Sequence, residues 1–346
     1  MKRTPTKVAK AQALTDGAAL NTGLVVGSHG RHCVVETPDG QRVICHPRGK
    51  KSQSVVGDRV RWLAATDEGT IEQVEPRRNL FYRQDEIRTK SFAANLDQVL
   101  ILIAAEPEFS ETQLTRALIA AEAEQIRPVI ALNKCDLGAL FESAWQRLAP
   151  YRAMGYTVIP LSLKEAQQQA DHPDQYCPLS PLAAEGQAQL LQLLSGQTTL
   201  VLGPSGSGKS TLINSLVPGA QVVTGEISQA LNSGKHTTTT TTWYWVDSLA
   251  NVNDKANATP QRTALIDSPG FQEFGLHHIA SAQLAQLMPD IKAHATACRF
   301  YNCTHLHEPG CNVLAQVETE TTPGAISARR HRIYHQLFDE LGQQRW

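Results

Sequence analysis

Residues 199–211 read TLVLGPSGSGKST, and this stretch decides how the chain folds. Its first four residues form an apolar run typical of a buried strand, and the next eight match the phosphate-binding loop G-x-x-x-x-G-K-[ST]. Glycines let the backbone wrap closely around a phosphate, and the N-terminus of the following helix adds positive partial charge. The predicted phosphate-binding residues are Gly203, Pro204, Ser205, Gly206, Ser207, Gly208, Lys209, Ser210 and Thr211.

The last residues of this loop carry the predicted chemistry. We expect Lys209 to contact the β- and γ-phosphates, which makes it a candidate catalytic residue, and the Ser210 hydroxyl to bind Mg²⁺. A Gly/Ser-rich linker is the alternative interpretation. The strand before the loop and the helix after it favour nucleotide binding.

The composition sets broad limits. A chain of 346 residues predicts two or three domains, and its net charge of −1 does not by itself suggest a polyanion partner. No apolar run approaches the length of a membrane span, and the seven cysteines do not resemble a disulfide framework. We therefore expect a reducing, cytoplasmic setting.

The N-terminal part is basic. Residues 1–62 carry eleven Lys and Arg against four acidic residues, a net charge of +7, which indicates either a nucleic-acid-binding surface or a solvated basic face. Residues 1–19 have no periodicity and predict a mobile basic arm. Residues 20–79 contain about five short alternating strands with a hairpin signal at Pro38-Asp39-Gly40, which predicts a small barrel of the oligonucleotide-binding (OB) type or an SH3-like barrel.

Strands and helices alternate in residues 80–275, which predicts an α/β fold with a parallel sheet. After a linker with a short helix at 80–95, the continuous apolar runs predict buried strands at 98–104, 128–132 and 157–161. Expected helices cover 110–124, with Ser110 as N-cap, 140–154 and 186–194; further strands cover 243–246 and 263–266. Residues 165–182 and 248–262 are expected to form a surface loop and a hairpin insertion.

The motif Asn133-Lys134-Cys135-Asp136 follows one of these strands and predicts a guanine-binding site. The Asp136 carboxylate would accept hydrogen bonds from the guanine N1–H and exocyclic amine, a donor pair that adenine lacks. Position at the carboxyl end of a strand supports this prediction, because ligands bind open α/β sheets there. Ser162, Leu163 and Lys164 follow the next strand and are expected to lie against the base through backbone N–H groups.

Asp267-Ser-Pro-Gly270 completes the nucleotide motifs, although a simple Pro-Gly turn is the alternative. We expect Asp267 to hold Mg²⁺ through water and the Gly270 N–H to sense the γ-phosphate. The motif order is unusual, because the guanine-binding motif precedes the phosphate loop, whereas most small GTPases have the reverse order. Whatever follows residues 267–275 is therefore tethered directly to the nucleotide-sensing segment.

The residue after Gly270 is Phe271, where Ras-like proteins carry a glutamine that orients the attacking water. A phenyl ring cannot orient water, so we expect slow intrinsic hydrolysis. His236, in Gly-Lys-His-Thr-Thr, is the candidate to position water, with a loop histidine of no role as the alternative. Thr238 is the threonine that we expect to close on Mg²⁺.

A cysteine cluster near the C-terminus predicts a metal site. Cys298, Cys303, His305 and Cys311 supply three thiolates and an imidazole within fourteen residues, which suits a closed tetrahedral zinc site. His307 is an alternative to His305, and free thiols are the alternative to a metal. The helix expected at 325–341 carries a basic set that could meet RNA phosphates or remain a solvated face: Arg329, Arg330, His331, Arg332 and His335.

Together these motifs closely resemble the ribosome small subunit-dependent GTPase A family of circularly permuted GTPases, over residues 20–345. The resemblance implies a multidomain fold with an OB-type β-barrel (20–79), a permuted α/β P-loop GTPase domain (80–275) and a small, mainly helical zinc domain (276–346). It also implies GTP hydrolysis stimulated by the small ribosomal subunit, a role in late subunit maturation, contact with rRNA, one structural zinc, Mg²⁺ bound with GTP and a monomeric state. The long threonine run at 237–242, which contains Thr238, is a departure from the family pattern.

Two other functional classes remain open at this point. A P-loop ATPase or kinase would prefer ATP, against which Asp136 argues. A non-catalytic RNA-binding module would bind GTP without turnover, and Phe271 is compatible with that alternative.

Overall fold

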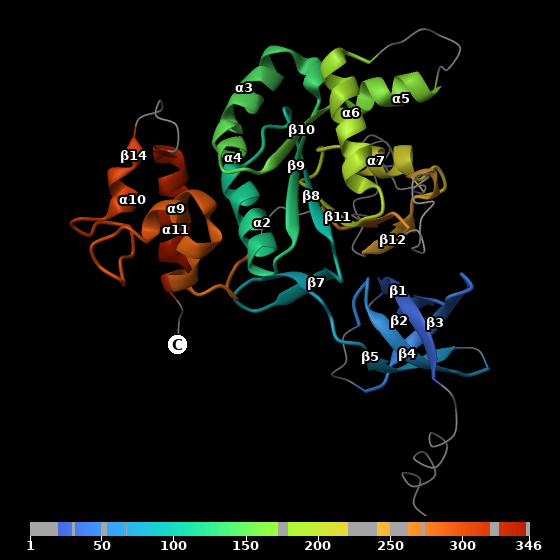
Figure 1. Ribbon diagram of the computed structural model, residues 1–346. Helices are drawn as coiled ribbons and strands as arrows, with labels where there is room; N and C mark the ends of the chain where they lie inside the picture. The colour runs from blue at the N-terminus through green and yellow to red at the C-terminus, as the bar shows by residue number, and fades with distance from the viewer. Residues whose placement is uncertain are drawn as a thin grey trace, which may run out of the picture.

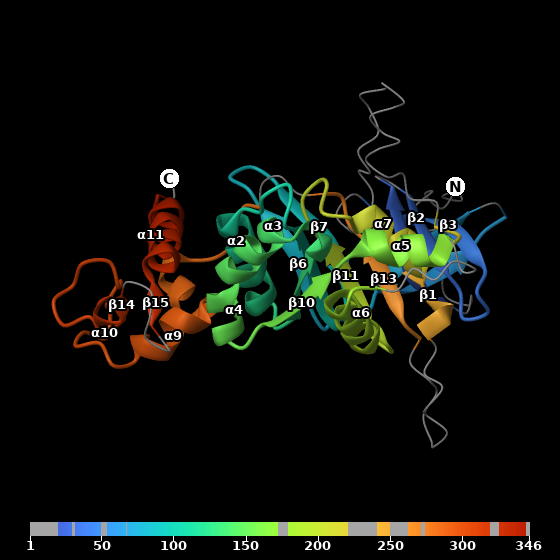
Figure 2. The same ribbon diagram turned by 90° about the horizontal axis from the view of Figure 1, so that it is seen from above.

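A computed structural model describes residues 20–29, 32–49, 54–66, 68–171, 179–220, 241–249, 262–270, 274–318 and 325–343. The N-terminal barrel and the C-terminal helices lie on opposite sides of a central α/β sheet (Figures 1 and 2). This arrangement confirms the predicted fold class. Among the described residues, no helix is both long enough and apolar enough to cross a bilayer.

The barrel closes on itself through five strands in the order β1-β2-β3-β5-β4, with β1 also paired to β4. The β3–β5 pair is parallel and the other pairs are antiparallel, which fits the OB type rather than the SH3-like alternative. Alternate residues point inward onto Trp62 and Ile71. The strands are β1 (Asn21–His29), β2 (His32–Glu36), β3 (Arg42–Pro47), β4 (Arg59–Ala64) and β5 (Gly69–Val74).

A β-hairpin occupies 80–94, so the linker with a short helix expected at 80–95 is wrong. Strands β6 (Leu80–Gln84) and β7 (Thr89–Ala94) bring Phe81 and Phe92 against Phe274, with ring centroids 5.7 and 6.1 Å from that residue. Aromatic residues are enriched in strands, where they pack against neighbouring side chains on one face of the pleated surface. Backbone hydrogen bonds between Gln84 and residues 275 and 277 also join the hairpin to the segment that leads to the C-terminal domain.

The central sheet has the order β10-β9-β8-β11-β13-β12, and its first five strands are parallel. The middle residues of these strands are apolar and buried, as expected for a parallel sheet that helices cover on both faces. The strands are β8 (Gln98–Ala104), β9 (Arg127–Asn133), β10 (Thr157–Leu161), β11 (Thr198–Leu202), β12 (Thr242–Trp245) and β13 (Ala264–Asp267).

Two groups of helices cover the two faces of this sheet (Figure 1). One face packs against α2 (Glu111–Ala123), α3 (Ala139–Arg147) and α4 (Ala149–Ala153). The other packs against α5 (Leu163–Asp171), α6 (Pro181–Leu194) and α7 (Lys209–Leu216). Short 3-10 turns, η1 (Cys135–Leu137) and η2 (Asp247–Leu249), follow β9 and β12.

Three helical expectations need correction. The helix expected at 140–154 is split between α3 and α4, because Pro150 lacks an N–H and cannot lie inside a continuous helix. The loop expected at 165–182 is helical up to residue 171, and α6 begins at Pro181 rather than at 186 because Ser180 caps it.

The predicted Ser110 cap of α2 is confirmed, because Ser110 Oγ accepts from the Gln113 N–H at 3.3 Å. Most of the insertion expected at 248–262 lies outside the described residues.

The C-terminal domain is mainly helical, as predicted. Ser327 Oγ accepts from the Arg330 N–H at 3.2 Å, so the last helix begins after Ser327 rather than at 325. The elements are η3 (Ser281–Leu287), α9 (Pro289–Ala295), α10 (Asn312–Ala315), β14 (Val317–Glu318), β15 (Ile326–Ser327) and α11 (Ala328–Gly342).

Arg330 does not belong to the basic surface expected on α11, because its side chain is only 2% exposed. Its guanidinium donates to both carboxylate oxygens of Asp290, at 2.8 and 3.1 Å, and to Thr115 Oγ1 on α2 at 2.7 Å. Arg116 on α2 also pairs with Glu340 on α11. The contacts with Thr115 and Arg116 fix the C-terminal domain against α2, on one face of the central sheet.

We predict that Asp290→Ala lowers the free energy of unfolding by about 3–5 kcal/mol, because it leaves the buried Arg330 charge unpaired. The matched control is Asp339→Ala, which removes an exposed pair with His335 on α11 and should cost less than about 1 kcal/mol. Urea unfolding followed by circular dichroism measures both. Equal destabilisation by the two variants would contradict the role given to Arg330.

Candidate functional site

The phosphate loop connects β11 to α7 in the form that the sequence predicts. Gly206 and Gly208 have φ angles of +79° and +103°, which side chains with a Cβ rarely adopt. A Cβ on Gly203 would lie 2.2 Å from the Leu102 carbonyl oxygen, so the loop can cross β8 only with glycine there. Gly208 caps α7, whose first N–H groups therefore face the space that a phosphate would occupy.

Lys209 is the first residue of α7, and its side chain reaches back across the phosphate loop. Its Nζ donates to the Gly203 carbonyl at 3.0 Å and would lie 3.3 Å from a Cβ built on Gly270. The structure therefore brings together the phosphate loop and the Asp-x-x-Gly motif. Burial lowers the pKa of Lys209, and the nearby Asp267 opposes that shift.

Asp267 ends β13 and is buried beside Lys209. Burial raises the pKa of Asp267 to about 6, and the Lys209 charge limits the rise. The next residue, Ser268, donates from Oγ to the Val201 carbonyl at 2.7 Å and so ties this turn to the strand before the phosphate loop. This role of Ser268 is not evident from the sequence.

Asn133 joins the predicted guanine-binding motif to the phosphate loop. Its Nδ2 donates to the Ser207 carbonyl at 2.9 Å, and its Oδ1 accepts from the N–H groups of Lys134, at 2.8 Å, and Leu163, at 3.1 Å. A single buried side chain is therefore hydrogen-bonded to three of the predicted nucleotide-binding segments. Lys134 adopts a left-handed φ of +70°, which turns the chain sharply from β9 into η1.

Asp136 is exposed at the carboxyl edge of the sheet, where Ser162 Oγ donates to its Oδ1 at 3.0 Å. This contact holds one oxygen of the exposed carboxylate. The Leu163 N–H, expected to lie against a base, instead donates to Asn133, and Leu163 and Lys164 are the first two residues of α5. Burial raises the pKa of the adjacent Cys135 thiol to about 11, so it is neutral at physiological pH.

His236, Thr238 and Phe271 lie outside the described residues. The described chain resumes at residue 241 and enters β12, which pairs antiparallel with β13 through Thr242 and Asp267.

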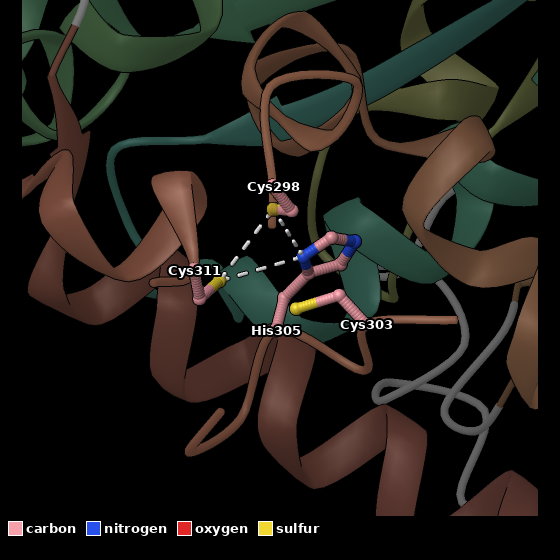
Figure 3. Close-up of side chains that lie close together, drawn as sticks. All are labelled: Cys298, Cys303, His305 and Cys311. Carbon is pink, nitrogen blue, oxygen red and sulfur yellow. Dashed lines mark hydrogen bonds between the residues drawn. The ribbon is translucent and has the colours of Figure 1, made fainter. Parts of the chain in front are cut away.

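The predicted metal ligands converge in the C-terminal domain (Figure 3). Cys298 Sγ lies 3.8 Å from Cys311 Sγ, and the His305 Nδ1 lies 3.5 and 3.6 Å from these two sulfurs. Tetrahedral zinc, with bonds of about 2.3 Å to sulfur and about 2.1 Å to nitrogen, requires ligand separations of about 3.6–3.8 Å. With Cys303 as the fourth donor, the set fits zinc; His307 is exposed and lies outside the cluster.

The loop that carries His305 is held from two sides. The Glu308 carboxylate accepts from the N–H groups of Thr304, at 2.7 Å, and Leu306, at 3.2 Å. On the other side, His331 Nε2 contacts the His305 carbonyl and Tyr334 Oη donates to the Thr304 carbonyl, each at 2.8 Å. Helix α11 therefore supports the metal loop, a role that the sequence did not reveal.

The barrel also contacts the central sheet, at the edge strand β12. Gly27 of β1 pairs with Thr242 of β12, so the barrel and the central sheet are one hydrogen-bonded structure. Trp245 Nε1 donates to Glu36 Oε1 at 2.6 Å across this junction.

A cavity of about 360 Å³ lies at the opposite edge of the central sheet from the nucleotide motifs. Arg127 and Thr157, at the amino ends of their strands, line it.

Comparison with known proteins agrees with this geometry. The sequence model of the RsgA GTPase family matches residues 74–176 and 172–277. A protein of Variovorax paradoxus described as small ribosomal subunit biogenesis GTPase RsgA is 66% identical over 344 residues, covering 99% of this chain and 98% of the relative. A protein of Burkholderia pseudomallei with the same description is 47% identical and covers 99% of both chains.

Solved structures have the same architecture. YjeQ from Thermotoga maritima superposes with a TM-score of 0.67 at 26% identity, covering 94% of this chain and all of that one. YloQ, described as a circularly permuted GTPase, gives a TM-score of 0.63 at 23% identity, covering 96% of this chain and 98% of that one. The family model covers more than half of this chain, and the two relatives match almost the whole chain. The chain therefore belongs to the RsgA GTPase family.

Proposed function

We propose that this chain is a GTPase of small ribosomal subunit biogenesis, which binds the subunit late in its maturation and hydrolyses GTP to GDP and phosphate when the subunit stimulates it. The observation that carries the proposal is the convergence of three motifs on one edge of the sheet, with Asn133 bonded to both the phosphate loop and the segment after β10. The relatives described above are named for small-subunit biogenesis, which supports the choice of partner.

In this proposal the phosphate loop from Gly203 to Thr211 wraps the phosphates, with Lys209 supplying positive charge to the β- and γ-phosphates. The Ser210 hydroxyl and the buried Asp267 are oxygen donors of the kind that Mg²⁺ prefers, so they would hold the ion with Thr238. Bound there, Mg²⁺ would neutralise phosphate charge during hydrolysis. The Gly270 N–H, close to Lys209, would bind the γ-phosphate.

Asp136 would select guanine. The Ser162 hydroxyl holds one carboxylate oxygen, so the carboxylate presents a fixed pair of acceptors to the N1–H and exocyclic amine. Adenine cannot satisfy both acceptors, which argues against the ATPase or kinase alternative.

Hydrolysis by the free protein should be slow, because Phe271 replaces the glutamine that orients water in Ras-like proteins. We propose that contact with the subunit places His236 to position the attacking water. If His236 has no such role and the subunit does not stimulate turnover, the non-catalytic RNA-binding alternative is favoured.

The two outer domains would contact the subunit. Arg59 and Arg61 point outward from β4, and Arg332 is exposed on α11, which supports binding to rRNA phosphates.

The Cys3His set would hold one structural zinc in a reducing compartment. The protein would act as a monomer. The zinc domain follows residues 267–275 directly, so its contacts with the subunit would respond to the nucleotide state.

We predict that Asp136→Asn shifts nucleotide preference from guanosine to xanthosine triphosphate. An asparagine amide N–H can donate to the xanthine 2-oxo group. The guanine 2-amino group is itself a donor, so it cannot accept a hydrogen bond from that N–H. Binding and hydrolysis of both nucleotides measure the exchange, and Asp97→Asn, at the start of β8 away from the site, is the matched control. Unchanged guanine preference in Asp136→Asn would contradict the base-binding role.

We predict that Gly208→Ala abolishes GTP binding and, with it, GTP-dependent co-sedimentation with small ribosomal subunits. The added Cβ would lie 2.5 Å from Asn133 Nδ2 at a φ of +103°, which disturbs both the loop and the Asn133 bridge. Gly219→Ala is the matched control, because no atom lies within 4 Å of its Cβ. Retained nucleotide binding in Gly208→Ala would show that the site does not depend on this bridge.

We predict that Glu308→Gln lowers zinc affinity about 10–100-fold, because loss of the carboxylate loosens the loop that carries His305. Competition with a chromophoric chelator measures the affinity, with the exposed Glu142→Gln on α3 as control. If both variants bind zinc equally well, Glu308 does not support the metal site.

A further inference from the structure

A second group of metal-binding side chains lies on the barrel, far in sequence from the cysteine cluster. It comprises His32 of β2, His46 of β3 and Glu68, which directly precedes β5. The His32 and His46 rings lie 4.5 Å apart between centroids, and His46 Nε2 contacts Glu68 Oε2. All three potential ligand atoms lie within 4.8 Å of one another.

The register of the barrel places these residues together. Cys33 of β2 lies opposite Cys45 of β3, and both are buried, so the adjacent His32 and His46 lie on the outer face. Strand β5 pairs with β3 through Gly69 and Cys45, so Glu68, the residue before Gly69, lies on the outer face diagonally from His46, which its side chain contacts. A Cβ on Gly69 would lie 2.6 Å from both Cys45 Sγ and the Trp62 ring, so glycine permits this close approach.

The donor set indicates which ions fit. Two imidazole nitrogens and one carboxylate oxygen suit zinc, nickel or copper, whereas Mg²⁺ and Ca²⁺ prefer oxygen ligands alone. Ligands that share such an ion lie about 3–3.5 Å apart, so rotamer adjustments of the order of 1 Å complete the site. His32 and Glu68 are exposed, which leaves a coordination position open to solvent, unlike the buried Cys3His set.

We propose that His32, His46 and Glu68 form a second, solvent-open site for a divalent transition metal of the zinc class. The site rests on the barrel geometry alone and is independent of the GTPase function proposed above. Its occupancy would bridge three strands of the barrel and add positive charge to the outer face of the domain.

Zinc titration of the full chain by isothermal calorimetry tests this proposal. The starting protein carries one zinc per chain, verified by metal analysis, so that the Cys3His set is already filled. We expect one further equivalent to bind to the unaltered chain, and both His32→Ala and His46→Ala to lose it while keeping the first. Glu68→Gln should weaken the second equivalent at least tenfold.

The matched control is His335→Ala, which removes a histidine that contacts a carboxylate, Asp339, but belongs to no three-ligand group among the described residues. It should retain the second equivalent. Circular dichroism and GTP binding verify that the barrel variants are folded, and copper bound in the second site should show two nitrogen ligands by electron paramagnetic resonance. Absence of a second equivalent, or its persistence in both histidine variants, would overturn the proposal.

Discussion

The nucleotide site depends on one buried amide. Asn133 donates to the phosphate loop at Ser207 and accepts from Lys134 and Leu163, so it connects the ends of β9, β10 and β11. These segments are separated by up to 74 residues in the chain and meet only because parallel strands end at the same edge of the sheet. Loss of this side chain would leave backbone groups in all three segments without their partner, at a cost of about 1–3 kcal/mol for each buried group.

The permuted chain order gives this site two mechanical connections. On one side, β12 pairs with both β13 and the first strand of the barrel, and Trp245 donates to Glu36 across the junction. On the other side, the chain leaves residue 270 and is held at 275–277 by the β6–β7 hairpin before it enters the zinc domain. Backbone hydrogen bonds therefore join β12 to the barrel, and they join residues 275 and 277, at the entrance to the zinc domain, to the hairpin.

Much of the fold could be predicted from local sequence signals. The apolar runs identified the parallel strands, the alternating runs identified the barrel, and the spacing of the cysteines identified the metal cluster. The hairpin at 80–94 was missed because its strands are set by packing of Phe81 and Phe92 on Phe274, a contact across nearly two hundred positions. The same limit explains Arg330, which reads as part of a basic surface but is neutralised by Asp290 from another helix. The bonds of Asn133, Ser162 and Ser268 likewise follow from the arrangement of strands, which no single stretch of sequence specifies.

The most direct test of the account is GTP hydrolysis by the purified chain, with and without small ribosomal subunits, with ATP as the control nucleotide. The account predicts slow turnover of GTP alone, strong stimulation by the subunit and no comparable turnover of ATP. Tight GTP binding without stimulation would contradict it, because the chain would then be a GTP-bound binding module and the water-positioning role proposed for His236 would have no basis.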